Sequence, residues 1–126
     1  MECEQRRRAD PVRRGDIVLV DLEPVRGSEA SKRRPAILVS NDGANDRALA
    51  MGRGVVAVVP ITSNVAQVLP FQALIDVSES GLRRASKAQA EQVRSVDVAR
   101  ISGPVGRVSA SAMLEVDDAL RLHLSL

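Results

Sequence analysis

The apolar segments of this chain are short, which limits the folds that it can adopt. They are rich in β-branched residues and alternate with connectors rich in Gly, Pro, Asn and Asp, a pattern typical of strands and turns. The predicted strands cover residues 15–22, 35–40, 54–61, 71–77 and 86–96, with a shorter sixth piece at 99–102 and 106–108. Because helical segments do not alternate with these strands, the pattern favours a compact, mainly β fold over a βαβ crossover sheet.

Only the C-terminal segment has the period of a long helix. From Ser109 onward the apolar residues recur at helical spacing, and a serine at its start can cap it. The apolar positions are Met113, Val116, Leu120 and Leu124. The polar connector 41–53 is predicted to hold at most one helical turn, around residues 44–50.

The length of 126 residues indicates one folded domain. Residues 1–12 include a run of three arginines and are predicted to be a disordered basic tail, and residues 13–126 are predicted to form the domain. The longest apolar run, 54–61, is far shorter than the ~20 residues of a membrane-spanning helix, and no secretory signal is recognisable. We therefore expect a cytoplasmic protein with no membrane partner.

Cysteine and histidine each occur only once, as Cys3 and His123. This excludes an intrachain disulfide framework, a cysteine-rich zinc site and a mechanism that needs two histidines. We expect neither a metal nor another cofactor.

The basic residues are unusual in kind. Only Lys32 and Lys87 are lysines, so 16 of the 18 basic residues are arginines. Guanidinium groups bind phosphate through a bidentate fork, which suggests a phosphate-bearing partner, although a GC-rich genome accounts for the same excess. Phe71 is the only aromatic residue, so an aromatic stacking platform cannot dominate binding to a nucleic acid.

Three places combine polar side chains with rigid elements. Arg33 and Arg34 stand where a long polar loop meets the strand entered through a proline, which suits either an anion-binding point or surface ion pairs. Thr62 and Ser63 follow the apolar strand 54–61 and offer hydroxyl groups, although threonine is also a common strand-end residue. Two further polar residues occupy alternate positions of the predicted strand 86–96 and share a face there, which suits base recognition or simple solvation. They are Gln92 and Arg94.

The order of these segments resembles the MazF/PemK family of toxin endoribonucleases, over about residues 13–126. The matching motifs are Arg14-Gly15-Asp16-Ile17-Val18, Asp21-Leu22-Glu23-Pro24, Gly27-Ser28-Glu29, Arg34-Pro35-Ala36-Ile37-Leu38-Val39-Ser40-Asn41-Asp42, Pro60-Ile61-Thr62-Ser63 and Glu91-Gln92-Val93-Arg94, followed by the C-terminal helix. The resemblance implies a mainly β fold with α elements, namely an SH3-like small barrel of the CcdB/PemK type with a C-terminal helix.

The resemblance also implies a function. A toxin of a type II toxin–antitoxin system would cleave single-stranded mRNA at specific sequences without metal, leaving 2′,3′-cyclic phosphate and 5′-hydroxyl ends. Arg34 and Thr62 match the catalytic positions. The residues expected to bind RNA are Glu29, Arg33, Asn41, Ser63, Gln92 and Arg94. Glu29 is also the nearby carboxylate that could accept a proton. The expected partners are a second copy of the chain and an acidic, partly disordered MazE-like antitoxin.

Two other functions fit the same fold. A gyrase-binding toxin is not expected to need both Arg34-Pro35 and Thr62, and the chain lacks the C-terminal tryptophan of such toxins. A catalytically inactive regulator that only binds its antitoxin is disfavoured by the intact Arg34 and Thr62. The chain also departs from the family pattern in its polar Lys87, Gln89 and Glu91, and this bears on the sequence that it cuts.

Overall fold

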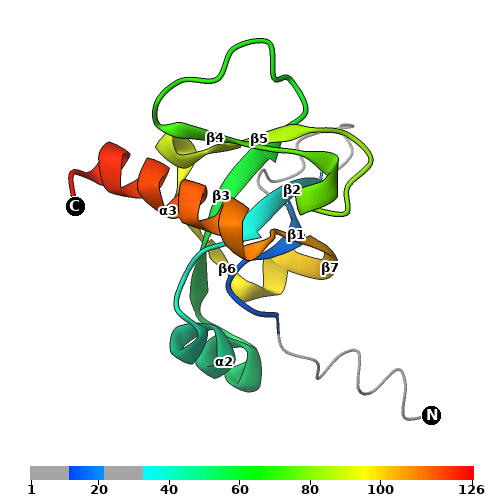
Figure 1. Cartoon of the computed structure of the whole chain (residues 1–126). Coiled ribbons are helices and arrows are strands. Elements are labelled where there is room, and N and C mark those ends of the chain that lie inside the picture. The colour runs from blue at the N-terminus through cyan, green and yellow to red at the C-terminus, as the bar shows by residue number, and fades with distance from the viewer. Residues whose placement is uncertain (1–11, 22–32) are drawn as a thin grey trace, which may run out of the picture.

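Seven strands form one antiparallel sheet, and two helices pack against it (Figure 1). The computed structural model describes residues 12–21 and 33–126. In chain order the elements are β1 (Asp16–Asp21), β2 (Arg33–Leu38), α2 (Asp42–Met51), β3 (Val55–Thr62), β4 (Gln72–Ile75), η1 (Val77–Glu79), β5 (Ser86–Gln89), η2 (Ala90–Gln92), β6 (Arg94–Asp97), η3 (Val98–Arg100), β7 (Ile101–Arg107) and α3 (Ala110–Leu124), where η denotes a 3₁₀ turn. The predicted mainly β fold with a closing C-terminal helix is confirmed.

Five of the strands form a small barrel. They are hydrogen-bonded in the order β7–β1–β2–β3–β6, and the turn η3 alone joins β6 to β7 at the two ends of this order. The remaining two strands extend the sheet from the last residues of β3 in the order β3–β5–β4. Strand β3 therefore belongs both to the barrel and to the extension.

The change of partner along β3 explains one wrong prediction. Residues 55–58 of β3 pair with β6, whereas Ile61 and Thr62 pair with β5, and the turn η2 lies between β5 and β6. Pro60 has no backbone N–H, and it lies between the part of β3 that pairs with β6 and the part that pairs with β5. The predicted strand 86–96 is thus two strands and a turn, and Gln92 lies in that turn instead of sharing a strand face with Arg94.

Two further strands differ from the predictions. Strand β2 begins at Arg33 and not at Pro35, because it pairs with β1 as far back as Arg33 opposite Asp21. Pro35 fits there because the pairing of β2 with β3 begins only at Ala36. The two pieces predicted at 99–102 and 106–108 are one strand, β7.

The connector 41–53 contains a full helix, α2, instead of a single turn. The side chain of Asn41 caps its N-terminus by accepting a hydrogen bond from the backbone N–H of Ala44 (2.8 Å). Gly52 ends the helix in the left-handed conformation, at φ 68°. Only Asn45 and Ala48 of this helix are buried, so its apolar stripe is too thin to stand out in the sequence.

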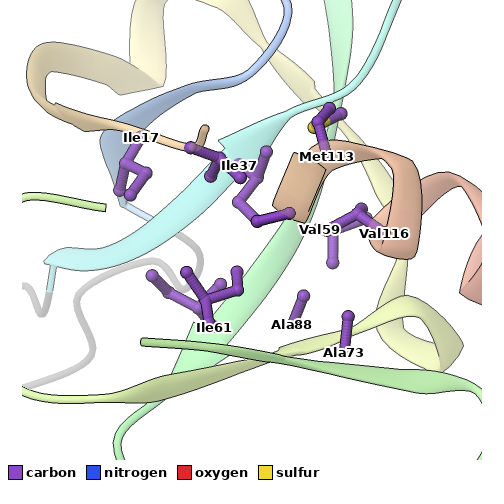
Figure 2. Packing of buried hydrophobic residues seen from close by; sticks show 11 residues of the cluster. Ile17, Ile37, Val59, Ile61, Ala73, Ala88, Met113 and Val116 are labelled. Atoms are coloured by element: carbon purple, nitrogen blue, oxygen red, sulfur yellow. The ribbon is translucent and has the colours of Figure 1, made fainter. Parts of the chain in front are cut away.

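Two clusters of buried side chains occupy the two faces of the sheet. The helix-side core fills the space between the sheet and α3, as Figure 2 shows, and includes Ile17, Ile37, Val59, Ile61, Ala73, Ala88, Met113 and Val116. The barrel core consists of Val12, Val18, Val20, Ala36, Leu38, Ala48, Val56, Val58, Val96 and Val98. Val12 is buried in the barrel core, so this last residue of the predicted tail belongs to the folded domain; residues 1–11 lie outside the described residues.

Helix α3 begins where the sequence predicts. The hydroxyl of Ser109 accepts a hydrogen bond from the backbone N–H of Ala112 (3.1 Å) and so caps the helix. No helix among the described residues combines the length and apolar character that crossing a bilayer requires.

Arg14 ties both helices to the start of β1. Its guanidinium donates to Asp117 of α3 (2.6 Å) and to the backbone carbonyl of Val39 (2.8 Å), and its backbone N–H donates to the Asp42 carboxylate at the start of α2 (2.7 Å). The charged residues of the motif Arg14-Gly15-Asp16 therefore make contacts within the fold. Asp16 is itself buried and forms an ion pair with Arg107.

Acid should weaken this junction. The hydrogen bond from the Arg14 backbone N–H lowers the pKa of Asp42 below its ordinary 3.8, and the side-chain amide of Asn45 and the charge of Arg13 act in the same direction. A carboxyl whose pKa is lower in the folded state stabilises the fold above its unfolded pKa, and this stabilisation disappears as pH falls through the folded value. We expect Asp42→Asn to lower the free energy of unfolding by up to about 1 kcal/mol at pH 7 and by less at pH 3, measured by urea denaturation. A difference that does not change with pH would contradict this assignment.

Candidate active site

Arg34 and Thr62 lie on the same face of the sheet. In β2, Ala36 and Leu38 belong to the barrel core and Ile37 to the helix-side core, so Arg34 lies on the barrel-core face. In β3, Val58 belongs to the barrel core and Ile61 to the helix-side core, so Thr62 lies on the barrel-core face as well. Both residues stand at strand ends, where the barrel core gives way to polar side chains.

The strand register, continued beyond its last paired residues, points to a close approach of Arg34 and Thr62. Strands β2 and β3 pair as Ala36 with Pro60 and Ile37 with Val59, and the same register carried two residues further would place Arg34 opposite Thr62. Side chains that are directly opposite on neighbouring antiparallel strands have Cβ atoms about 5 Å apart. On its other edge Arg34 is opposite Val20, a fully buried residue of β1, so its backbone is held by a rigid strand.

Within residues 12–21 and 33–126, the hydroxyl group of Thr62 donates no hydrogen bond. Its oxygen accepts a hydrogen bond from the backbone N–H of Asn64 (3.2 Å), which fixes its orientation at the start of the following loop. A hydroxyl group has one hydrogen to donate in addition to its acceptor positions. The proton of Thr62 can therefore be donated to a bound oxygen.

Arg34 is also open to a ligand. Its side chain is exposed, and it makes no hydrogen bond or ion pair with any other described residue. A guanidinium group presents its donors in a planar fork that fits two oxygens of a phosphate. Arg34 and Thr62 together can thus supply a cation and a neutral donor to one phosphoryl group.

Three of the other predicted site residues lie on or beside strand β3, which carries Thr62. Ser63 follows Thr62 directly and is exposed. Arg94 is opposite Val58 in β6 and is exposed on the barrel-core face, four residues along β3 from Thr62. Gln92 is exposed at the end of η2, which connects β5 to β6 beside β3.

Two of the remaining predicted residues are not brought to the pair, and the third lies outside the described residues. Arg33 is opposite Asp21 and, by strand alternation, lies on the other face of β2 from Arg34. Asn41 follows the opposite end of β2, and its side chain is engaged in capping α2. Glu29 lies outside the described residues.

Two residues near the pair escaped the sequence predictions. Asn64 orients the Thr62 hydroxyl through its backbone N–H. Every residue except proline has this group, so the sequence does not single out Asn64. Lys87, which the sequence marks only as a polar departure from the family pattern, is opposite Thr62 in β5, and a local pattern does not reveal that strand pairing. Among the described residues, no three of His, Cys, Asp and Glu gather in a way that could hold a metal ion.

Comparisons with known proteins match nearly the whole chain. Residues 13–124 match the model of a family described as PemK-like, MazF-like toxin of type II toxin–antitoxin system. The endoribonuclease MazF9 of Mycobacterium tuberculosis is 55% identical over 115 residues, which are 91% of this chain and 98% of that protein. An endoribonuclease structure from a mycobacterial species superposes with a TM-score of 0.72 at 19% identity, covering 93% of this chain and 94% of the other. The MazE–MazF crystal structure (Form-II) from Deinococcus radiodurans superposes with a TM-score of 0.71 at 25% identity, covering 91% and 96%.

Proposed function

We propose, because this chain belongs to the PemK-like, MazF-like family of toxins of type II toxin–antitoxin systems, that Arg34 and Thr62 form the centre at which it cleaves single-stranded RNA. The endoribonuclease activity rests on the 55% identity to MazF9, which extends over almost all of both chains. The observation that carries the assignment of the centre is that Arg34 and Thr62 share one sheet face on neighbouring strands, and that no described residue accepts a hydrogen bond from the Arg34 guanidinium or the Thr62 hydroxyl.

The reaction proposed for this centre uses the RNA as its own nucleophile. The 2′-hydroxyl oxygen forms a bond to the adjacent phosphorus, and the bond from phosphorus to the 5′-oxygen of the next nucleotide breaks. The 2′-hydroxyl loses one proton and the departing 5′-oxygen gains one, so the products are a 2′,3′-cyclic phosphate and a 5′-hydroxyl, and the reaction consumes neither water nor a metal.

The two residues have separate parts in this reaction. Negative charge grows on the non-bridging oxygens of the phosphoryl group, and the Arg34 guanidinium binds it. The Thr62 hydroxyl donates to the same group and fixes its orientation for in-line attack. A guanidinium group presents donors and no acceptor, so we assign charge stabilisation to Arg34 and not proton acceptance. Glu29 remains the carboxylate proposed to accept the 2′-hydroxyl proton.

The partners follow from the same family relationship. We assign single-stranded RNA to the strand ends that carry Arg34 and Thr62, where the barrel core gives way to polar side chains, with Ser63, Gln92 and Arg94 along the β3 edge as candidate RNA contacts. Arg33, Asn41 and Glu29 stay predictions of the sequence. A MazE-like antitoxin is the proposed inhibitor, since the Deinococcus radiodurans MazF was solved together with MazE. A homodimer is the proposed assembly.

The nature of the RNA ends tests this function. We expect the purified chain to cut a long single-stranded RNA at discrete sequences in excess EDTA and to leave 2′,3′-cyclic phosphate and 5′-hydroxyl ends. The ends are identified by ligation methods that accept only one type of terminus. Discrete cuts with 5′-phosphate ends would contradict the 2′-hydroxyl mechanism, and absence of cutting would favour the gyrase-binding or inactive-regulator alternatives, which a supercoiling assay separates.

A further inference from the structure

Lys87 stands directly beside the proposed centre. Strand β5 pairs with β3 so that Lys87 is opposite Thr62 and Ala88 is opposite Ile61. Ala88 belongs to the helix-side core, so Lys87 lies on the other face of β5, the face that carries Thr62 and Arg34. Adjacent strands are about 4.8 Å apart, which places one cationic residue on each side of Thr62.

The ammonium group of Lys87 has capacity to bind a ligand. To the residues that the structure describes it donates one hydrogen bond, which goes to the backbone carbonyl of Gln67 (2.5 Å) in the loop that follows Thr62. An ammonium group carries three donors, so two remain. No carboxylate among the described residues lies within ion-pair distance of Lys87, so its charge is not neutralised by them.

We infer that Lys87 is a phosphate-binding residue of this centre, which holds the RNA backbone at a phosphate next to the one that is cleaved. The inference rests on the proposed function for the identity of the ligand. Arg34 and Thr62 engage the scissile phosphate, and the strand register sets Lys87 one strand spacing from Thr62 on the side opposite Arg34. A strand of RNA that crosses β2, β3 and β5 therefore meets Arg34, Thr62 and Lys87 in that order.

Lys87 could instead serve only to fix the loop through Gln67. The two roles predict different responses to salt, because a residue that neutralises a phosphate releases a counterion and a loop anchor does not. For single-stranded nucleic acid, each such contact contributes about 0.7 to the slope of log Kd against log salt concentration.

The test measures binding of a fluorescent 2′-O-methyl oligonucleotide of randomised sequence, which keeps the phosphates and lacks the nucleophile. Kd is determined by fluorescence anisotropy between 50 and 200 mM salt for the wild type and the variants Lys87→Gln, Lys87→Arg and Arg53→Gln. Arg53 is an exposed cation in the connection between α2 and β3 and serves as the matched control. These salt concentrations bracket the range over which counterion release is readily measured.

We expect Lys87→Gln to lower the slope by about 0.7, so that the wild type loses about 2.5-fold more affinity than the variant across this range. Lys87→Arg should restore the wild-type slope, and Arg53→Gln should keep it. An unchanged slope in Lys87→Gln, or a wild type that does not bind the oligonucleotide, overturns the inference. Failure of the proposed function is seen separately, as the absence of RNA cleavage by the wild type.

Discussion

Replacing Arg34 by alanine should reduce RNA cleavage by about 10²–10³-fold in kcat/KM, because removing one preorganised donor from a developing oxyanion typically has this effect. The fold should not change, since the side chain is exposed and contacts no other described residue through a hydrogen bond or ion pair. The measurement is single-turnover cleavage of an RNA that contains a mapped cut site. Circular dichroism and thermal unfolding report the integrity of the variant.

Two further variants separate the kinds of contribution that Arg34 makes. Arg34→Lys keeps the charge and loses the planar fork, so it should recover only part of the lost rate. Arg53→Ala removes an equally exposed arginine that lies outside the site, and its rate should match the wild type. Full activity in Arg34→Ala would remove Arg34 from the centre.

Replacing Thr62 by valine should reduce cleavage by about 10- to 100-fold. Valine keeps the branched shape of threonine and lacks the hydroxyl, and a hydrogen bond to a charged group contributes about 1.5–3 kcal/mol. Thr62→Ser keeps both the donor and the acceptor that meets the Asn64 N–H, so it should retain most of the activity. The rates of both variants are measured under the same single-turnover conditions.

Stability checks the interpretation of the Thr62 variants. Thr62 is half-buried at the end of β3, and the N–H of Asn64 is exposed and can bond to water when the hydroxyl is removed. Thr62→Val should therefore unfold close to the wild-type temperature. If valine and serine were equally active, the hydroxyl would have no part in the reaction.

The strands of the barrel are the part of the fold that the sequence predicts well. The β-branched runs around Ile17, Ile37 and Val59 coincide with β1, β2 and β3, because fully buried strands need apolar residues at consecutive positions. The C-terminal helix is predicted equally well, because its buried residues recur at helical spacing behind the cap of Ser109.

The errors arise where tertiary pairing or local capping decides the structure. Strand 86–96 is interrupted because β3 changes its partner beside Pro60, and a local pattern contains no information about that change. Helix α2 is fixed by the capping side chain of Asn41 and by Gly52, with too few buried residues to give a clear period. Asn41 and Gly52 are typical residues for the start and the end of a helix, but they identify α2 only after the helix between them is known.

In the candidate site, too, the local sequence predicts which residues are candidates, and strand pairing decides which of them lie together. Thr62 and Arg34 could be selected as polar residues at strand ends, but only the strand register brings them to one face. The same register adds Lys87 and separates Arg33, which local sequence places next to Arg34. Proximity along the chain is a poor guide in a sheet, because adjacent residues point to opposite faces.

The central claim is that Arg34 and Thr62 act on one phosphoryl group, and a double-mutant cycle tests it most directly. Single-turnover cleavage rates are compared for the wild type, Arg34→Ala, Thr62→Val and the double variant. Groups that act as a unit give strongly non-additive losses. We therefore expect the cleavage rate of the double variant to be at least about tenfold higher than the rate calculated by multiplying the two single losses. Losses that multiply to within about twofold would show two independent sites and would contradict the proposal.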